Sequence, residues 1–307
     1  MDTKLKTYAV GVDMGGTHIR IGAVTCEGTL HFFEKRKTKD VVDSQNPVES
    51  LSRFLSEYLH QLDGEVIGVG LGFPSVVSKD KKRIYTTPTM AALGDINIVD
   101  PLEASLNIPV YINNDVNHLL QYEISKREIA EDEIVLGFYI GTGYGNAIYM
   151  RNDFLEGKHG AAGELGHIPV YHADGLCNCG NVGCIETVAS GKRLLELYEA
   201  YFSDVPFEDI FSKYANHPVI DDFIKAVSMP IATEINIFDP HLVIIGGGVI
   251  GMKDFPRHLL VEKIIASCRK PVPAEGLVLE FAEDIHAAGV LGAASHIYEK
   301  MSKVTKV

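Results

Sequence analysis

One histidine and three cysteines lie close together in the sequence. His167, Cys177, Cys179 and Cys184 fall within 18 residues. One imidazole and three thiolates form a complete tetrahedral ligand set for zinc and leave no position for a water molecule. A closed set of this kind is typical of a structural site that orders a loop. We therefore predict a structural Zn²⁺, the alternative being three free cysteines near a surface histidine.

Three glycine-rich turns have the composition of phosphate-binding loops. Residues 13–17 read Asp-Met-Gly-Gly-Thr, residues 141–145 read Gly-Thr-Gly-Tyr-Gly, and residues 246–248 are three glycines. Without a Cβ atom in the way, backbone N–H groups can approach phosphate oxygens. Asp13 stands at a strand end, where a carboxylate can hold a hydrated Mg²⁺ that accompanies a nucleotide. The alternative for each turn is a simple tight connection between two elements.

Three carboxylates are candidates for work on a substrate. Asp115 follows a predicted strand and precedes a predicted helix that begins at residue 116 or 117, which is a common place for ligand-binding residues in α/β folds. Capping of that helix by Asn114 or Asp115 is the competing interpretation. Glu164 and Glu186 flank the cysteine motif. Near an apolar loop both need hydrogen-bond partners, which the hydroxyls of a polyol would supply.

The elements that must position these residues begin as a meander. Three β-rich runs at 8–13, 18–24 and 30–36 are separated by turns that contain glycine. Apolar residues recur with helical spacing over 48–62, and the apolar runs at 66–73 and 109–112 are typical of buried strands. This alternation of strands and helices predicts an α/β lobe. A dinucleotide-binding fold is not expected, because Gly15 and Gly141 both lead into further strands instead of a helix.

The second half of the chain repeats the opening pattern. Residues 134–150 resemble residues 8–24: an apolar strand, a glycine-rich turn and a second apolar strand. A long helix over 219–238, strands within 241–250 and 277–281 and a helix over 287–301 complete this half. We interpret the repeat as an internal duplication that gives two related α/β lobes. The predicted boundaries are 1–116 for the first lobe, joined by the C-terminal helix at about 292–307, and 117–291 for the second lobe.

Length, charge and cysteine content exclude several classes of protein. A chain of 307 residues favours two domains. Its 28 basic and 41 acidic residues give a net charge of −13, which disfavours binding to nucleic acid or to acidic membranes. The sequence shows no signal peptide and no membrane span. Because the five cysteines do not form a disulfide framework either, we expect a cytoplasmic protein.

These motifs together resemble one family. The sequences DMGGT at 13–17, Asn114-Asp115, ELGH at 164–167 and CNCGNVGCIE at 177–186 are similar to the signature of the ROK (repressor, ORF, kinase) sugar kinases. The resemblance extends from residue 8 to about residue 297. It implies the two-lobed hexokinase/actin-like ATPase fold, which is also described as ribonuclease H-like. It also implies an enzyme that uses ATP and Mg²⁺ to transfer the γ-phosphoryl group to a hexose hydroxyl. A homodimer is usual in the family.

The resemblance also implies roles for individual residues. Asp115 matches the catalytic base that accepts the proton of the attacking hydroxyl. Asn114, Glu164, His167 and Glu186 match sugar-contacting positions, so that His167 would hold zinc with one ring nitrogen and face the sugar with the other. The residues that match ATP-binding positions are Asp13, Gly15, Gly16, Thr17, Gly141, Thr142, Gly143, Gly145, Gly246, Gly247 and Gly248.

The resemblance extends to the substrate. The segments GVDMGGTHIR, GFPSVVSKDKKRIYTTP and GELGHIPV look most like those of family members that phosphorylate D-allose, which implies D-allose 6-phosphate as the product. Thr89 and Met90 stand where many glucose-type members carry an Asn-Leu pair, and this difference bears on which sugar epimer is preferred. Glucose, fructose and N-acetylmannosamine remain alternative substrates.

Two other classes of protein compete with a kinase. A transcriptional repressor of the same family would need a DNA-binding segment of several dozen residues ahead of the first glycine-rich turn, and only twelve residues precede Asp13. A non-catalytic sugar sensor or zinc-stabilised binding module would have no use for the glycine-rich turns together with Asp13 and Asp115. The sequence therefore favours an enzyme.

Overall fold

The computed structural model describes residues 6–86, 91–283 and 285–304 and divides into two compact units. Unit 1 comprises Met1–Glu128, Glu156–Ala162 and Ile285–Val307, and unit 2 comprises Ile129–Leu155 and Gly163–Asp284. The first boundary therefore falls after Glu128 and not at residue 116, because the helix that begins at Asp115 packs against the C-terminal helix. Thr89 and Met90 lie outside the described residues.

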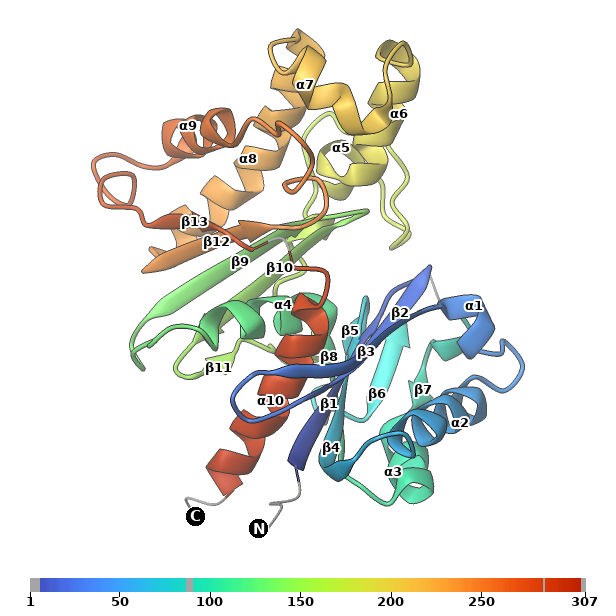
Figure 1. Cartoon of the computed structure of the whole chain (residues 1–307). Helices are drawn as coiled ribbons and strands as arrows, with labels where there is room; N and C mark the ends of the chain where they lie inside the picture. The colour runs from blue at the N-terminus through green and yellow to red at the C-terminus, as the bar shows by residue number, and fades with distance from the viewer. Residues whose placement is uncertain (1–5, 87–90, 284, 305–307) are drawn as a thin grey trace. The chain divides into compact units, whose positions relative to one another are not determined.

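Unit 1 is built on a five-stranded sheet with the order β3-β2-β1-β4-β8 (Figure 1). Its strands are β1 (Lys6–Met14), β2 (His18–Val24), β3 (Leu30–Lys37), β4 (Gly64–Phe73) and β8 (Val110–Asn114). The first three strands form the predicted antiparallel meander, whereas β4 runs parallel to β1 and β8 runs parallel to β4. The carboxyl ends of β1, β4 and β8 consequently share one edge of the sheet.

Alternation along β1 divides its side chains between the two faces of the sheet. Tyr8, Val10 and Val12 are fully buried in the larger core of the unit, with residues of α2 (Pro47–Leu59). Ala9 belongs to a smaller core under α10 (Ala288–Val304). Small residues on this second face let the helix approach closely, since a Cβ atom at Gly11 would lie 1.9 Å from the carbonyl oxygen of Val290. Figure 1 shows α10 beside β1 and α4.

Shorter elements complete unit 1. They are α1 (Thr38–Val41), α3 (Val99–Leu106), α4 (Asp115–Ile124), the 3₁₀ turn at Ala91–Leu93, and a small three-stranded sheet of β5 (Val76–Val77), β6 (Arg83–Thr86) and β7 (Ile96–Asn97). Residues 156–162 belong to unit 1 although they follow a strand of unit 2. Glu156 pairs with Lys81 at 2.9 Å, which ties this segment to the unit.

Unit 2 repeats the sheet of unit 1. Its order is β11-β10-β9-β12-β13, formed by β9 (Ile134–Ile140), β10 (Tyr144–Met150), β11 (Asp153–Phe154), β12 (Leu242–Gly246) and β13 (Leu279–Phe281). Again three antiparallel strands are followed by two parallel ones. The matching order of strands confirms the duplication predicted from the sequence.

The helices of unit 2 follow, in the chain, the loop that carries the predicted zinc ligands. They are α5 (Glu186–Ala189), α6 (Gly191–Tyr201), α7 (Ile210–Tyr214), α8 (Pro218–Phe238) and α9 (Arg257–Ser267), with 3₁₀ turns at Leu165–His167 and Phe207–Asp209. One face of α8 carries Phe223, Val227 and Ile231 into the same core as Phe138 of β9. The apolar spacing at i, i+4 and i+8 explains this burial.

The long elements confirm the sequence analysis, and the short ones show where it was incomplete. All the predicted strands occur, and the helices predicted over 48–62, 219–238 and 287–301 are α2, α8 and α10. α2 ends at Leu59, and α4 begins at Asp115, slightly before the predicted start. The sequence analysis did not predict the sheet of β5, β6 and β7, the strand β11, the 3₁₀ turns or the helices α1, α3, α5, α6, α7 and α9. None of the described helices combines the length and the apolar character needed to cross a membrane.

Candidate active site and metal centre

The predicted zinc ligands converge in unit 2. The ligand atoms of His167, Cys177, Cys179 and Cys184 all lie within 4.8 Å of one another. The Sγ atom of Cys177 is 3.4 Å from Nδ1 of His167, and the Sγ atoms of Cys179 and Cys184 are 3.6 Å apart. Zn–S bonds of about 2.3 Å and Zn–N bonds of about 2.0–2.1 Å in a tetrahedron place two sulfurs about 3.8 Å apart, and sulfur and nitrogen about 3.6 Å apart. The four side chains therefore fit a zinc ion.

Backbone pairing brings these four residues together. Isolated bridges join Pro169 to Cys184 and Leu176 to Val182, so the chain doubles back around the ligands. Gly183 turns with φ of 78°, and a Cβ atom there would lie 2.5 Å from the carbonyl oxygen of Ala173. Only glycine fits this turn without displacing the neighbouring backbone.

The three predicted sugar-contacting side chains of unit 2 also lie together. Nε2 of His167 points away from the cysteines and is 3.5 Å from a carboxylate oxygen of Glu164. Burial raises the pKa of Glu164, the nearby His167 lowers it, and the carboxylate of Glu186 raises it further. The geometry leaves one ring nitrogen of His167 for a metal and the other beside the carboxylate of Glu164. Such a cluster can hydrogen-bond several neighbouring hydroxyl groups.

The second and third glycine-rich turns meet at the carboxyl edge of the sheet of unit 2. Gly141 and Gly143 follow β9, and Gly247 follows β12, the parallel neighbour of β9. Gly247 has φ of 98°, and a Cβ atom there would lie 2.5 Å from the carbonyl oxygen of Ile140. In contrast, a Cβ atom at Gly141 or Gly248 would meet no atom within 4 Å. These two backbone positions therefore face open space.

The first glycine-rich turn lies at the corresponding edge of unit 1. Asp13 pairs with Gly72 across β1 and β4, and its carboxylate accepts a hydrogen bond from Arg20 at 2.8 Å. About a fifth of the Asp13 side chain is exposed (22%). Desolvation raises the pKa of Asp13, and Arg20 opposes this rise. An acid that keeps access to solvent at this edge fits the predicted position for a hydrated Mg²⁺.

Asn114 and Asp115 occupy the same edge, at the end of β8. Asn113 pairs with Gly72, so Asp13 and the Asn113–Asp115 segment lie on either side of β4. The structure separates the two candidate roles at the start of α4. The side chain of Asn114 caps α4 by accepting from the amide of Val116 at 2.9 Å, and it donates to the carbonyl oxygen of Ser75 at 3.2 Å. Asp115 is the first helical residue, and its Oδ1 also accepts from Val116, at 2.8 Å.

The structure thus brings the predicted residues together within each unit. In unit 1 they lie at the carboxyl edge of the sheet, whereas in unit 2 the glycine-rich turns lie at that edge and the loop cluster reaches them through Glu186, which accepts from the amide of Tyr144. Two further polar residues near these groups were not predicted. Arg20 donates a hydrogen bond to Asp13. This pairing could have been predicted from the sequence, because Arg20 lies opposite Asp13 in a short hairpin. Glu234 of α8 is only 5% exposed and accepts from Asn146 at 2.9 Å, and burial raises its pKa to about 7. The sequence feature that could have identified Glu234 is an acidic residue beside Ile231 and Ile235 on the apolar face of a helix.

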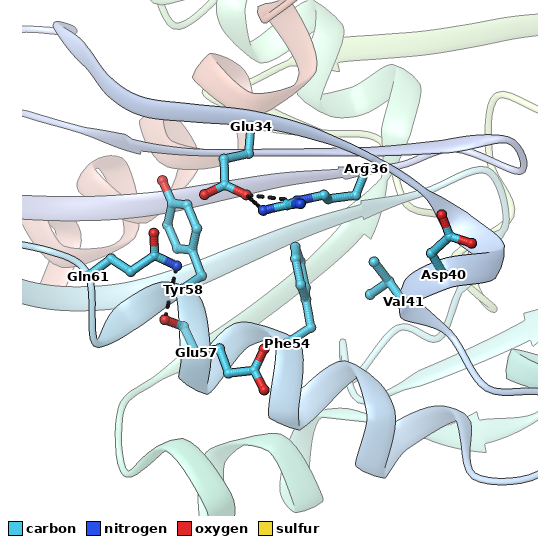
Figure 2. A pocket seen from close by; sticks show the side chains of 8 residues that line it. All are labelled: Glu34, Arg36, Asp40, Val41, Phe54, Glu57, Tyr58 and Gln61. Atoms are coloured by element: carbon cyan, nitrogen blue, oxygen red, sulfur yellow. Dashed lines mark hydrogen bonds and ion pairs between the residues drawn. The ribbon is translucent and has the colours of Figure 1, made fainter.

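A cavity of about 290 Å³ in unit 1 lies apart from the predicted residues. It is lined by β3, α1 and α2, and Figure 2 shows Glu34 and Arg36 paired on one side and Tyr58 and Phe54 on the other. None of the site residues predicted from the sequence lines it. The cavity therefore adds nothing to the assignment of the site.

Comparisons with known proteins agree with the motifs. The model of the ROK family matches residues 9–300. An N-acetyl-D-glucosamine kinase from Yersinia pseudotuberculosis is 30% identical, with 94% of this chain and 99% of that protein covered.

Solved structures show the same fold. One is a ROK family glucokinase from Streptomyces griseus in complex with glucose and AMPPNP, which is 25% identical in sequence and has a TM-score of 0.76. The match covers 95% of this chain and 99% of the glucokinase. A ROK family transcriptional regulator, described as a homologue of the E. coli MLC protein, is 23% identical with a TM-score of 0.80. It is covered over 82% of its chain and 99% of this one. The fold is therefore the two-lobed α/β fold of ROK hexokinases, and the chain belongs to the ROK family.

Proposed function

We propose that this protein is a sugar kinase that transfers the γ-phosphoryl group of ATP to O6 of D-allose. The observation that carries the proposal is the gathering of Asp13, Asn114, Asp115 and the glycine-rich turns at the carboxyl edges of the two sheets. In unit 1 this edge holds Asp13, Asn114 and Asp115. In unit 2 it holds the turns 141–145 and 246–248. Ligands of α/β folds bind at such edges.

In the proposed reaction, the bond between the γ-phosphorus and the bridging oxygen of ATP breaks, and a bond from the same phosphorus to O6 forms. Asp115 accepts the proton that O6 loses, and ADP leaves. Phosphoryl transfer depends mainly on positioning and on stabilising charge, so a base contributes only part of the rate. Mg²⁺ held near Asp13 would neutralise charge on the phosphates.

Recognition of the sugar is assigned to the polar cluster of unit 2 and to Asn114. Glu164, His167 and Glu186 would hydrogen-bond the hydroxyls of the hexose. The zinc ion has a structural role here, since its four protein ligands leave no site for a substrate atom. By occupying Nδ1 of His167, the ion would fix the ring so that Nε2 faces the sugar.

The choice of allose is supported by the resemblance of three sequence segments. A carboxylate that loses its hydroxyl partner in the wrong epimer is left unsatisfied, which costs about 1–3 kcal/mol for each group. The relatives named above act on N-acetyl-D-glucosamine and glucose according to their names, so both sugars compete with allose as candidates.

The test is a panel of hexoses with ATP and Mg²⁺. We expect kcat/KM for allose to exceed the values for glucose, mannose, fructose, N-acetylmannosamine and N-acetylglucosamine by at least about tenfold, as the loss of one or two hydrogen bonds predicts. Phosphorus NMR of the product should place the phosphate on O6. A smaller margin, or a preference for another sugar, would refute allose as the substrate. Sugar binding without turnover of any sugar would refute the kinase and favour a sugar sensor.

A further inference from the structure

Glu186 connects two features that the proposed function treats separately. Its Oε2 accepts a hydrogen bond from the amide of Tyr144 at 3.1 Å, at the end of the turn 141–145. The turn is shaped around this carboxylate, because a Cβ atom at Gly143 would lie 2.4 Å from the same oxygen. The other oxygen, Oε1, lies 4.0 Å from Sγ of the predicted zinc ligand Cys177. One side chain therefore contacts both the phosphate turn and the metal centre.

The residues that follow Glu186 hold the other side of the turn. The amide of Gly191 donates to the carbonyl oxygen of Gly141 at 2.8 Å, and the amide of Lys192 donates to that of Thr142 at 3.2 Å. These two donors belong to the first turn of α6, whose N–H groups have no partner within the helix itself. The segment 186–192 thus forms hydrogen bonds with the turn at both of its ends. Glu186 accepts a hydrogen bond from the turn, and Gly191 and Lys192 donate hydrogen bonds to it.

The same segment is fixed to the metal centre by its preceding residues. Cys184 stands two positions before Glu186, and its carbonyl oxygen accepts from both the amide and the hydroxyl of Thr187, at 2.9 and 2.7 Å. The amide of Ile185 donates to the carbonyl oxygen of Ile168, the neighbour of His167, at 2.9 Å. The backbone next to two predicted zinc ligands, Cys184 and His167, therefore fixes the position of Glu186 relative to the turn.

We propose that the segment 186–192 is a clamp through which an occupied metal centre holds the turn 141–145 in its nucleotide-binding shape, with Glu186 as the positioning residue. The statement that this turn binds a nucleotide rests on the proposed function. The statement that an occupied metal centre fixes the shape of the turn through the segment 186–192 does not. Loss of the metal should consequently weaken the binding of nucleotide as well as that of sugar.

Amide hydrogen exchange measures the clamp directly. The metal-loaded protein is compared with the protein after removal of zinc by a chelator. We expect the amides of Tyr144 and Gly191 to lose at least about tenfold of their protection, the equivalent of one hydrogen bond. The amide of Val249 is the internal reference. It donates to the carbonyl oxygen of Ile140, at the end of β9 directly before the turn, and has no bond to the clamp among the described contacts. Equal protection of Tyr144 with and without metal, in protein that stays folded, would overturn the proposal.

A double-mutant cycle tests the role of Glu186 in metal-loaded protein, so it decides the question even if chelation unfolds unit 2. Gly143→Ala introduces a Cβ atom against the carboxylate, and Glu186→Ala removes that obstacle. Exchange at Tyr144 and the Kd of AMPPNP are measured for both single variants and for the double variant. We expect strong non-additivity, with Gly143→Ala costing much less affinity in the Glu186→Ala background. Additive effects, or full protection of Tyr144 in Glu186→Ala, would contradict the clamp.

The outcomes separate the clamp from the proposed function. Glu196→Ala is the matched control, since it removes an exposed carboxylate of α6 that pairs only with Arg193 in the contacts described; it should leave exchange at Tyr144 unchanged. If Tyr144 responds to the metal but no variant binds AMPPNP, the clamp stands and the kinase assignment fails. If AMPPNP binds equally well to metal-free and metal-loaded protein, the kinase assignment stands and the clamp fails.

Discussion

The two glycine-rich hairpin turns sit at equivalent positions of two sheets with the same strand order, yet they are held in different ways. The turn of unit 1, residues 13–17, is anchored by its own meander. Thr38, directly after β3, donates from its hydroxyl to the carbonyl oxygen of Gly15 at 2.6 Å and from its amide to that of Thr17 at 3.0 Å. Arg20 on β2 holds Asp13.

The turn of unit 2 has one bond of its own, from the amide of Gly141 to the carbonyl oxygen of Gly143 at 3.1 Å, and is further held by bonds from outside its hairpin. Its anchors are Glu186, Gly191 and Lys192, which lie more than forty residues further along the chain. They belong to the long insertion between β11 and β12, which also carries the four candidate zinc ligands. The difference indicates that a duplicated scaffold can keep the same turn while exchanging a local anchor for a distant one. The clamp proposed above would make that distant anchor depend on a metal.

The largest effect is expected from a change that leaves both turns alone. Asp115→Asn is nearly isosteric, and Asn114 still caps α4. Turnover should fall by about 10²–10⁴-fold, the usual contribution of a general base. Hexose binding should stay near the level of the unaltered protein. Steady-state kinetics and calorimetric titration with the sugar measure the two quantities.

The control for this change is Asp132→Asn, on an exposed turn, which should have normal turnover. Exchange at the amides of Gly15 and Tyr144 should be the same in both variants, since neither turn depends on Asp115. An Asp115→Asn protein with near-normal turnover would remove Asp115 from the mechanism.

Much of this arrangement could be predicted from the sequence because it is encoded locally. Apolar runs and glycines specified the meander and its repeat, and the periodicity of residues 219–238 specified α8. The convergence of His167 with the three cysteines could be predicted because their residue types and short spacing leave few uses other than a shared metal site. The position of Asp115 followed from a strand directly before a helix. In each of these cases neighbouring residues carry the whole signal.

The rest could not be predicted because it depends on contacts between distant residues. The bond from Tyr144 to Glu186 joins positions 42 apart, and no spacing rule links them. The segment 156–162 joins unit 1 through an ion pair between Lys81 and Glu156, which no local pattern indicates. The small sheet of β5, β6 and β7 escaped prediction since strands of two to four residues have hardly any periodicity.

A second prediction concerns the core beneath the turn of unit 2, where Glu234 accepts from Asn146. Burial raises the pKa of Glu234 from 4.5 to about 7, so the fold favours the protonated form. Stability from this group is fully present below pH 4.5 and is lost as the pH rises through about 7. The loss amounts to about 3 kcal/mol, at 1.36 kcal/mol for each pKa unit.

Glu234→Gln should abolish this loss and make the protein more stable than the unaltered chain at pH 8. The amide can still accept from Asn146, and it can donate to Oδ1 of Asn146, which has no hydrogen-bond partner among the described residues. Thermal unfolding between pH 4.5 and 8 measures the effect. Glu262→Gln, an exposed acid on α9, should leave the pH profile unchanged. A Glu234→Gln protein with the same loss of stability above pH 5 would show that this carboxyl group is not its source.

The smallest effect is expected from the local anchor of unit 1. Thr38→Val keeps the shape of a side chain that is 5% exposed but removes the hydrogen bond to Gly15. One such bond contributes about 1 kcal/mol, so the Kd of AMPPNP should rise by about fivefold. Because this anchor does not involve the metal, the factor should be the same in metal-loaded and metal-free protein.

Thr233→Val is the matched control for this last change, since it also removes a hydrogen bond from a threonine hydroxyl to a backbone carbonyl, that of Met229 on α8. It should leave the affinity for nucleotide unchanged. Exchange at the amide of Gly15, which donates to His18, reports the state of the first turn. If Thr38→Val weakened nucleotide binding only in metal-loaded protein, the first turn would also depend on the metal. The two turns would then share one support, and the contrast between a local and a distant anchor would no longer hold.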